Sequence, residues 1–270
     1  MSRIDAAFQR MRDERRVGLV TYVTAGDPSL ERTGDVLTAL DRAGADVIEV
    51  GVPFSDPLAD GPVIQRACER ALAAGATLER ILTIVASVRA SVRAPIVLFS
   101  YANPVYRMGF DAFAARAASA GVDGALALDI PVEEALPLRS ALLDHGLDPI
   151  YLLSPTTTLE RARTADALGR GFLYLISRAG VTGARQTLSD GLPAIAGRVR
   201  EVTRLPLAVG FGLSRPEHVR AVAGVADAAV VGSALVSVIA EAGDSSDLAP
   251  RIERYVRWLR GDNPGVGLRD

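Results

Sequence analysis

Glu49 is the residue whose type and position most clearly suggest proton chemistry. It lies inside the apolar run 47–50, where a strand buried on both faces normally carries Val, Ile or Leu. Burial disfavours the charged form of a carboxyl group and raises its pKa, which suits a general acid or base. A structural Glu paired with an internal Arg or with backbone amides is the alternative.

Asp60 is a second candidate, near the end of a segment, residues 51–62, whose Gly, Pro, Ser and Asp content fits neither a helix nor a strand. This loop directly follows the run that holds Glu49, so both carboxyl groups should lie at the same edge of a sheet. Because Asp60 precedes Gly61 and Pro62, its side chain could also simply cap the next helix. The sequence alone leaves both roles open.

Glycines at the ends of two successive apolar runs could hold a phosphate group. Gly210 and Gly212 follow one run, and Gly232 with Ser233 follows the next. Exposed backbone amides, a hydroxyl group and the positive end of a helix bind phosphate dianions. Tight turns would explain either motif alone but explain the pair less well, so the sequence predicts a phosphate site here.

The composition argues against several other functions. The 30 basic residues are all Arg, so no Lys can form a Schiff base, and two His, His145 and His218, argue against a His-rich metal site. Acid–base work is left to carboxyl groups or Tyr. A net charge of −2 gives no reason to expect nucleic acid or an anionic membrane as partner. The lone Cys68 and the lack of an apolar run of roughly 20 residues agree with a cytoplasmic location.

Short apolar runs alternate with longer amphipathic segments, as in parallel strands joined by helices. The strands are predicted near residues 18–23, 47–50, 96–101, 124–128, 149–153, 172–176, 207–209 and 228–231. This α/β pattern in 270 residues predicts a single (β/α)8 TIM barrel, preceded by an extra N-terminal helix. The alternative is an open doubly wound sheet, but no Gly-x-Gly-x-x-Gly turn follows the first strand.

The chain shows no linker or low-complexity segment, so we expect one domain over residues 1–262 and a frayed tail over residues 263–270. Asp27 is expected to cap a helix that starts at Pro28. In barrels of this kind the chemistry lies on the loops that follow the strands. One such loop, residues 177–186, is polar and Gly-broken, and could act as a lid over a substrate.

Five motifs resemble the tryptophan synthase alpha chain family, and the resemblance extends from about Ile4 to the final helix. They are residues 22–28 (YVTAGDP), 49–62 (EVGVPFSDPLADGP), 101–104 (YANP), 177–183 (SRAGVTG) and 210–212 (GFG). The second motif is highly specific. The resemblance implies a lyase that cleaves indole-3-glycerol phosphate to indole and glyceraldehyde 3-phosphate, with no metal and no organic cofactor in this chain.

The resemblance also implies a role for each candidate residue. Glu49 would protonate C3 of the indole ring and help to remove the proton of the glycerol hydroxyl, while Asp60 would bond the indole N–H and stabilise the positive charge on the ring. Tyr174 would position the substrate and Glu49. The phosphate would be held by Gly183, Gly212, Gly232 and Ser233. The indole ring would be lined by Tyr22, Phe99, Tyr101, Thr182 and Phe211.

A protein partner follows from the same resemblance. In this family the alpha chain docks on a pyridoxal-phosphate beta chain, and an alpha2-beta2 heterotetramer is expected in which indole passes through an internal channel. The loops bearing Pro53, Asp56, Asn103 and Pro131 would face that beta chain. One departure from the family is Tyr22, which stands where many relatives carry Phe and places a hydroxyl group in an otherwise apolar slot.

Three alternatives compete with this interpretation. The chain could be a stand-alone indole-releasing lyase, active without a beta chain. It could be a non-catalytic sensor of a phosphate ligand that regulates a partner, although binding a phosphate needs no buried Glu. It could also be another phosphate-binding barrel, such as phosphoribosylanthranilate isomerase or indole-glycerol-phosphate synthase, but the synthase uses a Lys acid that this chain lacks.

Overall fold

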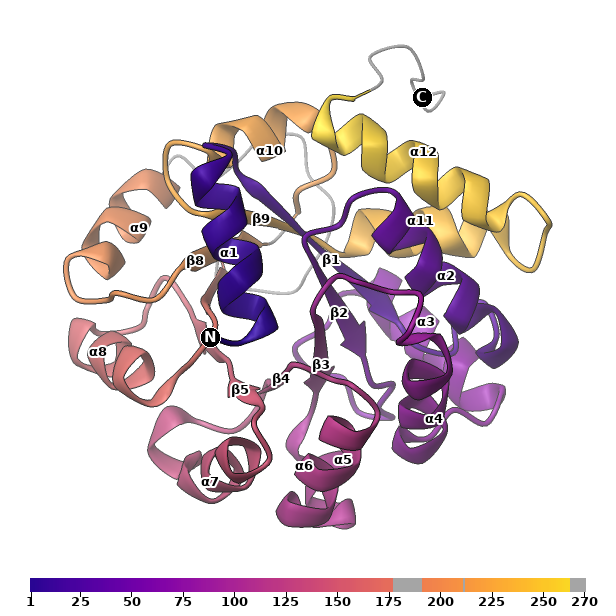
Figure 1. Cartoon of the computed structure of the whole chain (residues 1–270), viewed down its shortest axis with the longest axis horizontal. Coiled ribbons are helices and arrows are strands. Elements are labelled where there is room, and N and C mark those ends of the chain that lie inside the picture. The colour runs from indigo at the N-terminus through magenta and orange to yellow at the C-terminus, as the bar shows by residue number, and fades with distance from the viewer. Residues whose placement is uncertain (177–190, 211, 263–270) are drawn as a thin grey trace.

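The structure is a computed structural model that describes residues 1–176, 191–210 and 212–262. Its parallel strands form one sheet rolled into a nearly closed barrel, with helices around the outside (Figure 1). The strands are β1 Gly18–Thr24, β2 Val47–Gly51, β3 Ile96–Ser100, β4 Gly124–Ala127, β5 Asp148–Pro149, β6 Tyr151–Leu153, β7 Leu173–Ile176, β8 Leu207–Gly210 and β9 Ala228–Val231. The helices are α1 Arg3–Asp13, α2 Leu30–Arg42, α3 Pro62–Ala73, α4 Leu78–Val88, α5 Ala102–Met108, α6 Phe110–Ser119, the 3-10 helix η1 Val132–Glu134, α7 Leu136–Asp144, α8 Leu159–Leu168, α9 Leu192–Arg200, α10 Pro216–Val222, α11 Ser233–Ala242 and α12 Leu248–Arg260.

The barrel closes through the fifth predicted strand, which the structure divides in two. β5 bonds to β4 on one side, whereas β6, separated from β5 by Ile150, bonds to β7 on the other side. The strand order β5-β4-β3-β2-β1-β9-β8-β7-β6 therefore runs round the barrel and returns to the same stretch of chain. The predicted TIM barrel is confirmed, and the open doubly wound sheet was the wrong alternative.

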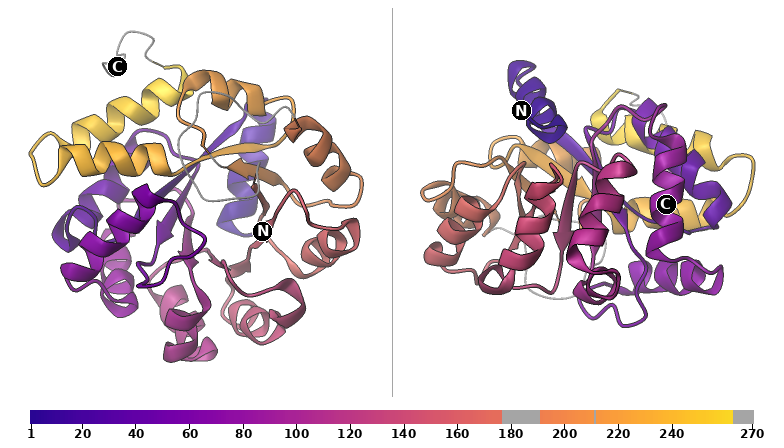
Figure 2. Two further views of the ribbon diagram at one scale, coloured as in Figure 1. Left: turned by 180° about the vertical axis from the view of Figure 1, so that it is seen from behind. Right: turned by 60° about the horizontal axis from the view of Figure 1, so that its bottom comes forward.

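The extra N-terminal helix α1 covers the end of the barrel at which the strands begin. It lies across the barrel in Figure 1, and the opposite end faces the viewer in the left view of Figure 2. Ile4, Phe8 and Met11 are buried, and the Phe8 ring lies 5.4 Å from that of Phe172, just before β7. These side chains join the inward-facing residues of the strands in one apolar cluster, which closes this end of the barrel.

Aspartates at the starts of strands bond the neighbouring strands at this closed end. The side chains of Asp46, Asp123 and Asp227 each accept a backbone N–H of a neighbouring strand, at 2.9, 2.8 and 2.7 Å respectively. Arg16 donates two further bonds of 2.7 Å to Asp46. Charge-assisted bonds of this kind are the stronger ones in proteins. They fix the strand register far from the open end, which leaves that end free for function.

Asp27 does not cap a helix, contrary to the prediction. α2 begins at Leu30 with Ser29 as its N-cap residue. Asp27 is buried instead and accepts two hydrogen bonds from the Arg70 guanidinium of α3, at 2.8 and 2.9 Å. A two-bond ion pair with a distant Arg is stronger than a single bond to a helix terminus, and this contact prevails over the local signal.

Two of the predicted segments fall where the structure gives no description. The predicted tail, residues 263–270, and the predicted lid, residues 177–186, lie outside the described residues. In the part of the chain that is described, no single helix has both the length and the apolar character to cross a membrane. The bent pair α3 and α4 passes that test only when both helices are taken together, across an angle of 93°.

Candidate active site

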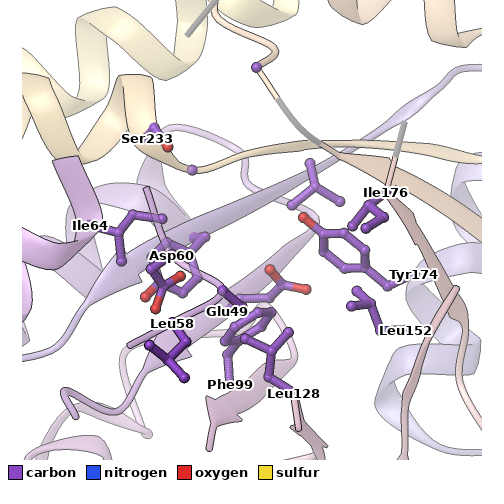
Figure 3. A pocket seen from close by; sticks show the side chains of 15 residues that line it. Glu49, Leu58, Asp60, Ile64, Phe99, Leu128, Leu152, Tyr174, Ile176 and Ser233 are labelled. Atoms are coloured by element: carbon purple, nitrogen blue, oxygen red, sulfur yellow. The ribbon is translucent and has the colours of Figure 1, made fainter. Parts of the chain in front are cut away.

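A cavity of about 280 Å³ opens at the end of the barrel where the strands finish (Figure 3). It brings together Glu49 and Asp60, the aromatic residues Tyr22, Phe99 and Tyr174, and the predicted phosphate-binding residues Gly212, Gly232 and Ser233. Three further predicted site residues, Thr182, Gly183 and Phe211, lie outside the described residues. From six strands or their following loops, the cavity therefore collects every other residue predicted for the site except Tyr101 and Gly210.

Glu49 lies on β2, inside the barrel. In the strand register it is the partner of Tyr22 on β1 and of Val97 on β3. Its side chain is fully buried, and neither carboxyl oxygen has a hydrogen-bond partner among the described residues. Burial raises the pKa of Glu49 to about 8. The described residues therefore do not form the alternative arrangement, in which a structural Glu is paired with Arg or with backbone amides. Near neutral pH this carboxyl group holds its proton and has no competing partner.

Asp60 lies on the loop after β2, and its position answers the question that the sequence left open. The N-cap residue of α3 is Gly61, so the Asp60 side chain does not cap that helix. The Tyr101 hydroxyl donates to Asp60 Oδ2 at 3.0 Å and accepts the backbone N–H of Ala59 at 3.1 Å. Burial raises the pKa of Asp60 to about 6, and the bond from Tyr101 counteracts part of that rise. Tyr101 stands behind Asp60 and orients it.

The two carboxyl groups have different protonation states at neutral pH. With pKa values of about 8 and about 6, Glu49 is neutral and Asp60 is ionised. In Figure 3 Glu49 lies in the middle of the cavity, with Asp60 on one side and Tyr174 on the other. A pair of acids whose surroundings separate their pKa values can supply a proton donor and a negative charge to the same ligand.

Aromatic side chains line the part of the cavity beside these acids, which we call the slot. The rings of Tyr22 and Phe99 meet edge to face at 5.3 Å, and those of Phe99 and Tyr174 at 6.4 Å. Burial and the nearby Glu49 raise the pKa of Tyr174 well above its usual value, so its hydroxyl stays protonated. Such walls suit a planar aromatic ligand.

The opposite side of the cavity is suited to an anion. α11 starts at Ser233, with Gly232 as an N-cap residue that forms no side-chain cap. The first backbone N–H groups of a helix have no partner within the helix, and they carry its positive dipole end. Gly212, near the start of the loop after β8, lines the same cavity. A phosphate group fits this combination of amides, a hydroxyl and a helix terminus.

Several lining residues were not predicted as site residues. They are Leu58, Ala59, Ile64, Leu128, Leu152, Ile176 and Val230. Those on or just after strands could have been found from the alternation of inward and outward side chains along each strand. Leu58 and Ala59 could not, because the path of the loop after β2 decides where they point.

Neither His belongs to the cavity. His218 is buried and accepts the backbone N–H of Ser214 at 3.2 Å, while His145 lies 3.0 Å from Asp111 at the surface. Within the described residues, no group of three or more His, Cys, Asp and Glu side chains is arranged to hold a metal ion.

Because Glu49 is unpaired, we expect it to reduce the stability of the fold. The pKa of this carboxyl group is 4.5 in the unfolded chain and about 8 in the folded protein. Between these two pH values the group is protonated in the folded state but ionised in the unfolded state, so the stability of the fold decreases as the pH rises from one value to the other. Glu49→Gln should therefore match the wild type at about pH 4 and exceed it by several kcal/mol at about pH 9. Urea unfolding at both pH values measures the difference, and an equal free energy of unfolding at high pH would contradict the unpaired burial.

Comparison with known proteins connects this geometry to one group. The family model for the tryptophan synthase alpha chain matches residues 8–257. The tryptophan synthase alpha chains of Solibacter usitatus and Geotalea uraniireducens are 47% and 48% identical to this chain over 269 and 268 residues, which cover 100% and 99% of this chain and 100% of each relative. The crystal structure of the alpha chain from Legionella pneumophila has a TM-score of 0.89 at 38% identity, with 100% of both chains covered. A tryptophan synthase structure from Mycobacterium tuberculosis has a TM-score of 0.88 at 38% identity, with 96% of both chains covered.

Proposed function

The chain belongs to the tryptophan synthase alpha chain family, and we propose that Glu49 and Asp60 carry out its cleavage of indole-3-glycerol phosphate to indole and glyceraldehyde 3-phosphate. One observation supports the assignment most strongly. Glu49 is fully buried with both oxygens unpartnered among the described residues, and it faces the same cavity as Asp60. A site that only bound a phosphate ligand would gain nothing from such a group, because burying it costs stability.

Glu49 acts first as the acid and then as the base. Its proton goes to C3 of the indole ring, which makes the ring system cationic. The resulting carboxylate then takes the proton of the hydroxyl on the carbon attached to C3. As that carbon becomes an aldehyde, its bond to C3 breaks and the electron pair returns to the ring, releasing neutral indole. Glu49 ends protonated, ready for the next turnover, and a pKa of about 8 suits both steps near neutral pH.

Asp60 stabilises the cation that forms between these steps. It is ionised at neutral pH, and it can accept the indole N–H while its other oxygen keeps the bond from Tyr101. A fixed negative charge in a water-poor cavity stabilises a developing positive charge more than it would in water. The charge is needed only while the ring is protonated, so this contact favours the transition state.

The remaining residues position the substrate. Gly212, Gly232 and Ser233 hold the phosphate at the start of α11, with Gly183 proposed as a further phosphate contact. The ring enters the slot that Tyr22, Phe99 and Tyr174 line, with its C3 towards Glu49. Thr182 and Phe211 complete the proposed slot. The phosphate fixes one end of the substrate and the slot fixes the other, so the reacting bond is held over the acid.

The family implies a beta chain as partner, and we infer that this chain binds it through the rim around the cavity. Two large apolar side chains are exposed on the segments that follow β2 and β3, Leu58 with 89% and Tyr106 on α5 with 72% of its surface accessible. The Phe54 ring lies 5.0 Å from that of Tyr101, which connects the loop after β2 to the start of α5. Asp56, Asn103 and Pro131 are exposed on the same rim, but Pro53 is buried and does not belong to this surface.

The cofactor and the location belong to the same proposal. Glu49 and Asp60 supply the acid, base and charge that the cleavage requires, so we infer that this chain works without metal or organic cofactor and that pyridoxal phosphate belongs to the beta chain. An alpha2-beta2 heterotetramer is the assembly we propose. The buried free thiol of Cys68 is consistent with a reducing compartment, which supports a cytoplasmic location.

Release of indole from indole-3-glycerol phosphate, assayed with and without a purified beta chain, tests this function. We expect slow release by the chain alone and stimulation of about tenfold or more by the beta chain, as for coupled sites. Fast release without stimulation would favour the stand-alone lyase. Retained binding of the phosphate ligand with no release in either condition would favour the sensor.

A further inference from the structure

Tyr22 lines the slot, and its hydroxyl group is buried without a good hydrogen-bond partner. Tyr22 has 6% of its surface accessible, and among the described residues its hydroxyl meets Thr24 Oγ1 at 3.5 Å. Bonds between two oxygens usually span about 2.5–3.0 Å, so this contact is weak. Tyr101 and Tyr255, by comparison, each donate a bond of 3.0 Å. The cost of desolvating the Tyr22 hydroxyl is therefore poorly offset.

The neighbouring strand provides the space for this hydroxyl. Gly51, at the end of β2, lies beside the Tyr22 ring, and a Cβ atom added there would come within 2.6 Å of Tyr22 Cζ and would collide with the hydroxyl oxygen. At the other end of the side chain, a Cβ atom added to Gly232 would lie 3.4 Å from Tyr22 Cβ. The side chain thus extends from the phosphate-binding end of the cavity towards the strand that carries Glu49.

The hydroxyl remains a hydrogen-bond donor under all ordinary conditions. Burial, and next the charge of Asp60, raise the pKa of Tyr22 well above its usual value. A protonated phenol that faces a ligand cavity can donate to an acceptor on the ligand. The six-membered ring of unsubstituted indole offers no such acceptor, and its N–H is the group assigned to Asp60.

We propose that the Tyr22 hydroxyl determines specificity in the slot by favouring indoles that carry an acceptor oxygen, such as a hydroxyl group, on the six-membered ring. This inference rests on the proposed function, because it names the class of indoles that the same slot selects. A site with a weakly bonded polar group gains more from a ligand that offers it a good hydrogen bond than from a ligand that offers none. One recovered hydrogen bond corresponds to a preference of about tenfold.

The test compares the wild type with Tyr22→Phe, which removes one oxygen atom and keeps the ring. Each open position of the six-membered indole ring is examined with a hydroxyindole and a methylindole, condensed with glyceraldehyde 3-phosphate in the reverse reaction. The readout is the ratio of kcat/KM for the hydroxy compound to that for the methyl compound, so any loss common to both substrates cancels. We expect the wild type to favour the hydroxy compound at one ring position. At that position the ratio measured for Tyr22→Phe should be about tenfold lower than the ratio of the wild type.

Tyr151→Phe is the matched control. The Tyr151 hydroxyl is also buried and has no partner among the described residues, but Tyr151 does not line the cavity. Its removal should leave every ratio unchanged. Ratios that stay constant in Tyr22→Phe at all positions, or that fall equally in the control, would overturn the inference.

Calorimetric binding of the same indoles separates this inference from the proposed function. If the wild type turns over indole but neither binds nor turns over hydroxyindoles preferentially, the specificity role fails while the proposed function stands. If catalysis is absent but binding shows a preference for a hydroxyindole that depends on Tyr22, the proposed function fails and the specificity role stands.

Discussion

Replacing Glu49 by Gln should lower the rate of indole release by about 10² to 10⁴, the usual contribution of a general acid or base. The amide has nearly the shape of the neutral carboxyl group, but it can neither give a proton to C3 nor take one from the glycerol hydroxyl. Because both steps depend on this group, kcat should fall much more than the affinity for the phosphate ligand. Steady-state kinetics with indole-3-glycerol phosphate, together with calorimetric binding of glycerol 3-phosphate, measure the two effects separately.

Glu31→Gln provides the control for this change. Glu31 is exposed on α2, away from the cavity, and its replacement should leave kcat and ligand affinity as they are in the wild type. Wild-type turnover by Glu49→Gln would remove Glu49 from the mechanism. A fall in phosphate affinity equal to the fall in kcat would instead indicate that the variant has lost its fold or its ligand site.

Replacing Asp60 by Asn should lower kcat by about 10² to 10³, because the variant loses the negative charge that stabilises the protonated ring. The two pKa values also predict a bell-shaped dependence of the rate on pH. The rate should fall below about pH 6 as Asp60 becomes protonated, and above about pH 8 as Glu49 loses its proton. Asp60→Asn should remove the acid limb and keep the alkaline limb. Rates of the wild type and the variant between about pH 5 and 9 test this prediction.

Asp13→Asn is the matched control for the charge. Asp13 is exposed on α1, at the closed end of the barrel, so its replacement should keep both limbs of the pH profile. If Asp60→Asn kept a near-normal rate and its acid limb, Asp60 would have no part in the chemistry. In that case its bond from Tyr101 would only hold the loop after β2 in place.

The roles of the two carboxyl groups can be tested together. If Glu49 and Asp60 act on the same transition state, the rate of the double variant should fall by less than the product of the two single-variant decreases, since removing either group already disables the step.

The different pKa values of Glu49 and Asp60 arise from different surroundings. Glu49 has only apolar burial, whereas Asp60 combines burial with a hydrogen bond from Tyr101.

The barrel and most of the candidate site can be predicted from the amino-acid sequence. Alternating apolar runs and amphipathic segments predict parallel strands and helices, because burial on both faces of a sheet demands continuous apolar strands. An acid inside such a run is conspicuous for the same reason, so the sequence alone is enough to identify Glu49. The glycines after β8 and β9 can also be identified, because successive strands of a barrel end at the same rim.

Which groups meet across long stretches of chain depends on the folded barrel. Asp60 precedes a helix and could have capped it, but Tyr101, just after the next strand β3, holds it instead. Asp27 likewise pairs with Arg70, and the Tyr22 hydroxyl occupies the space above Gly51. Sequence patterns report periodicity over a few residues, whereas hydrogen-bond partners, pKa values and free space depend on contacts between segments that are distant in the chain.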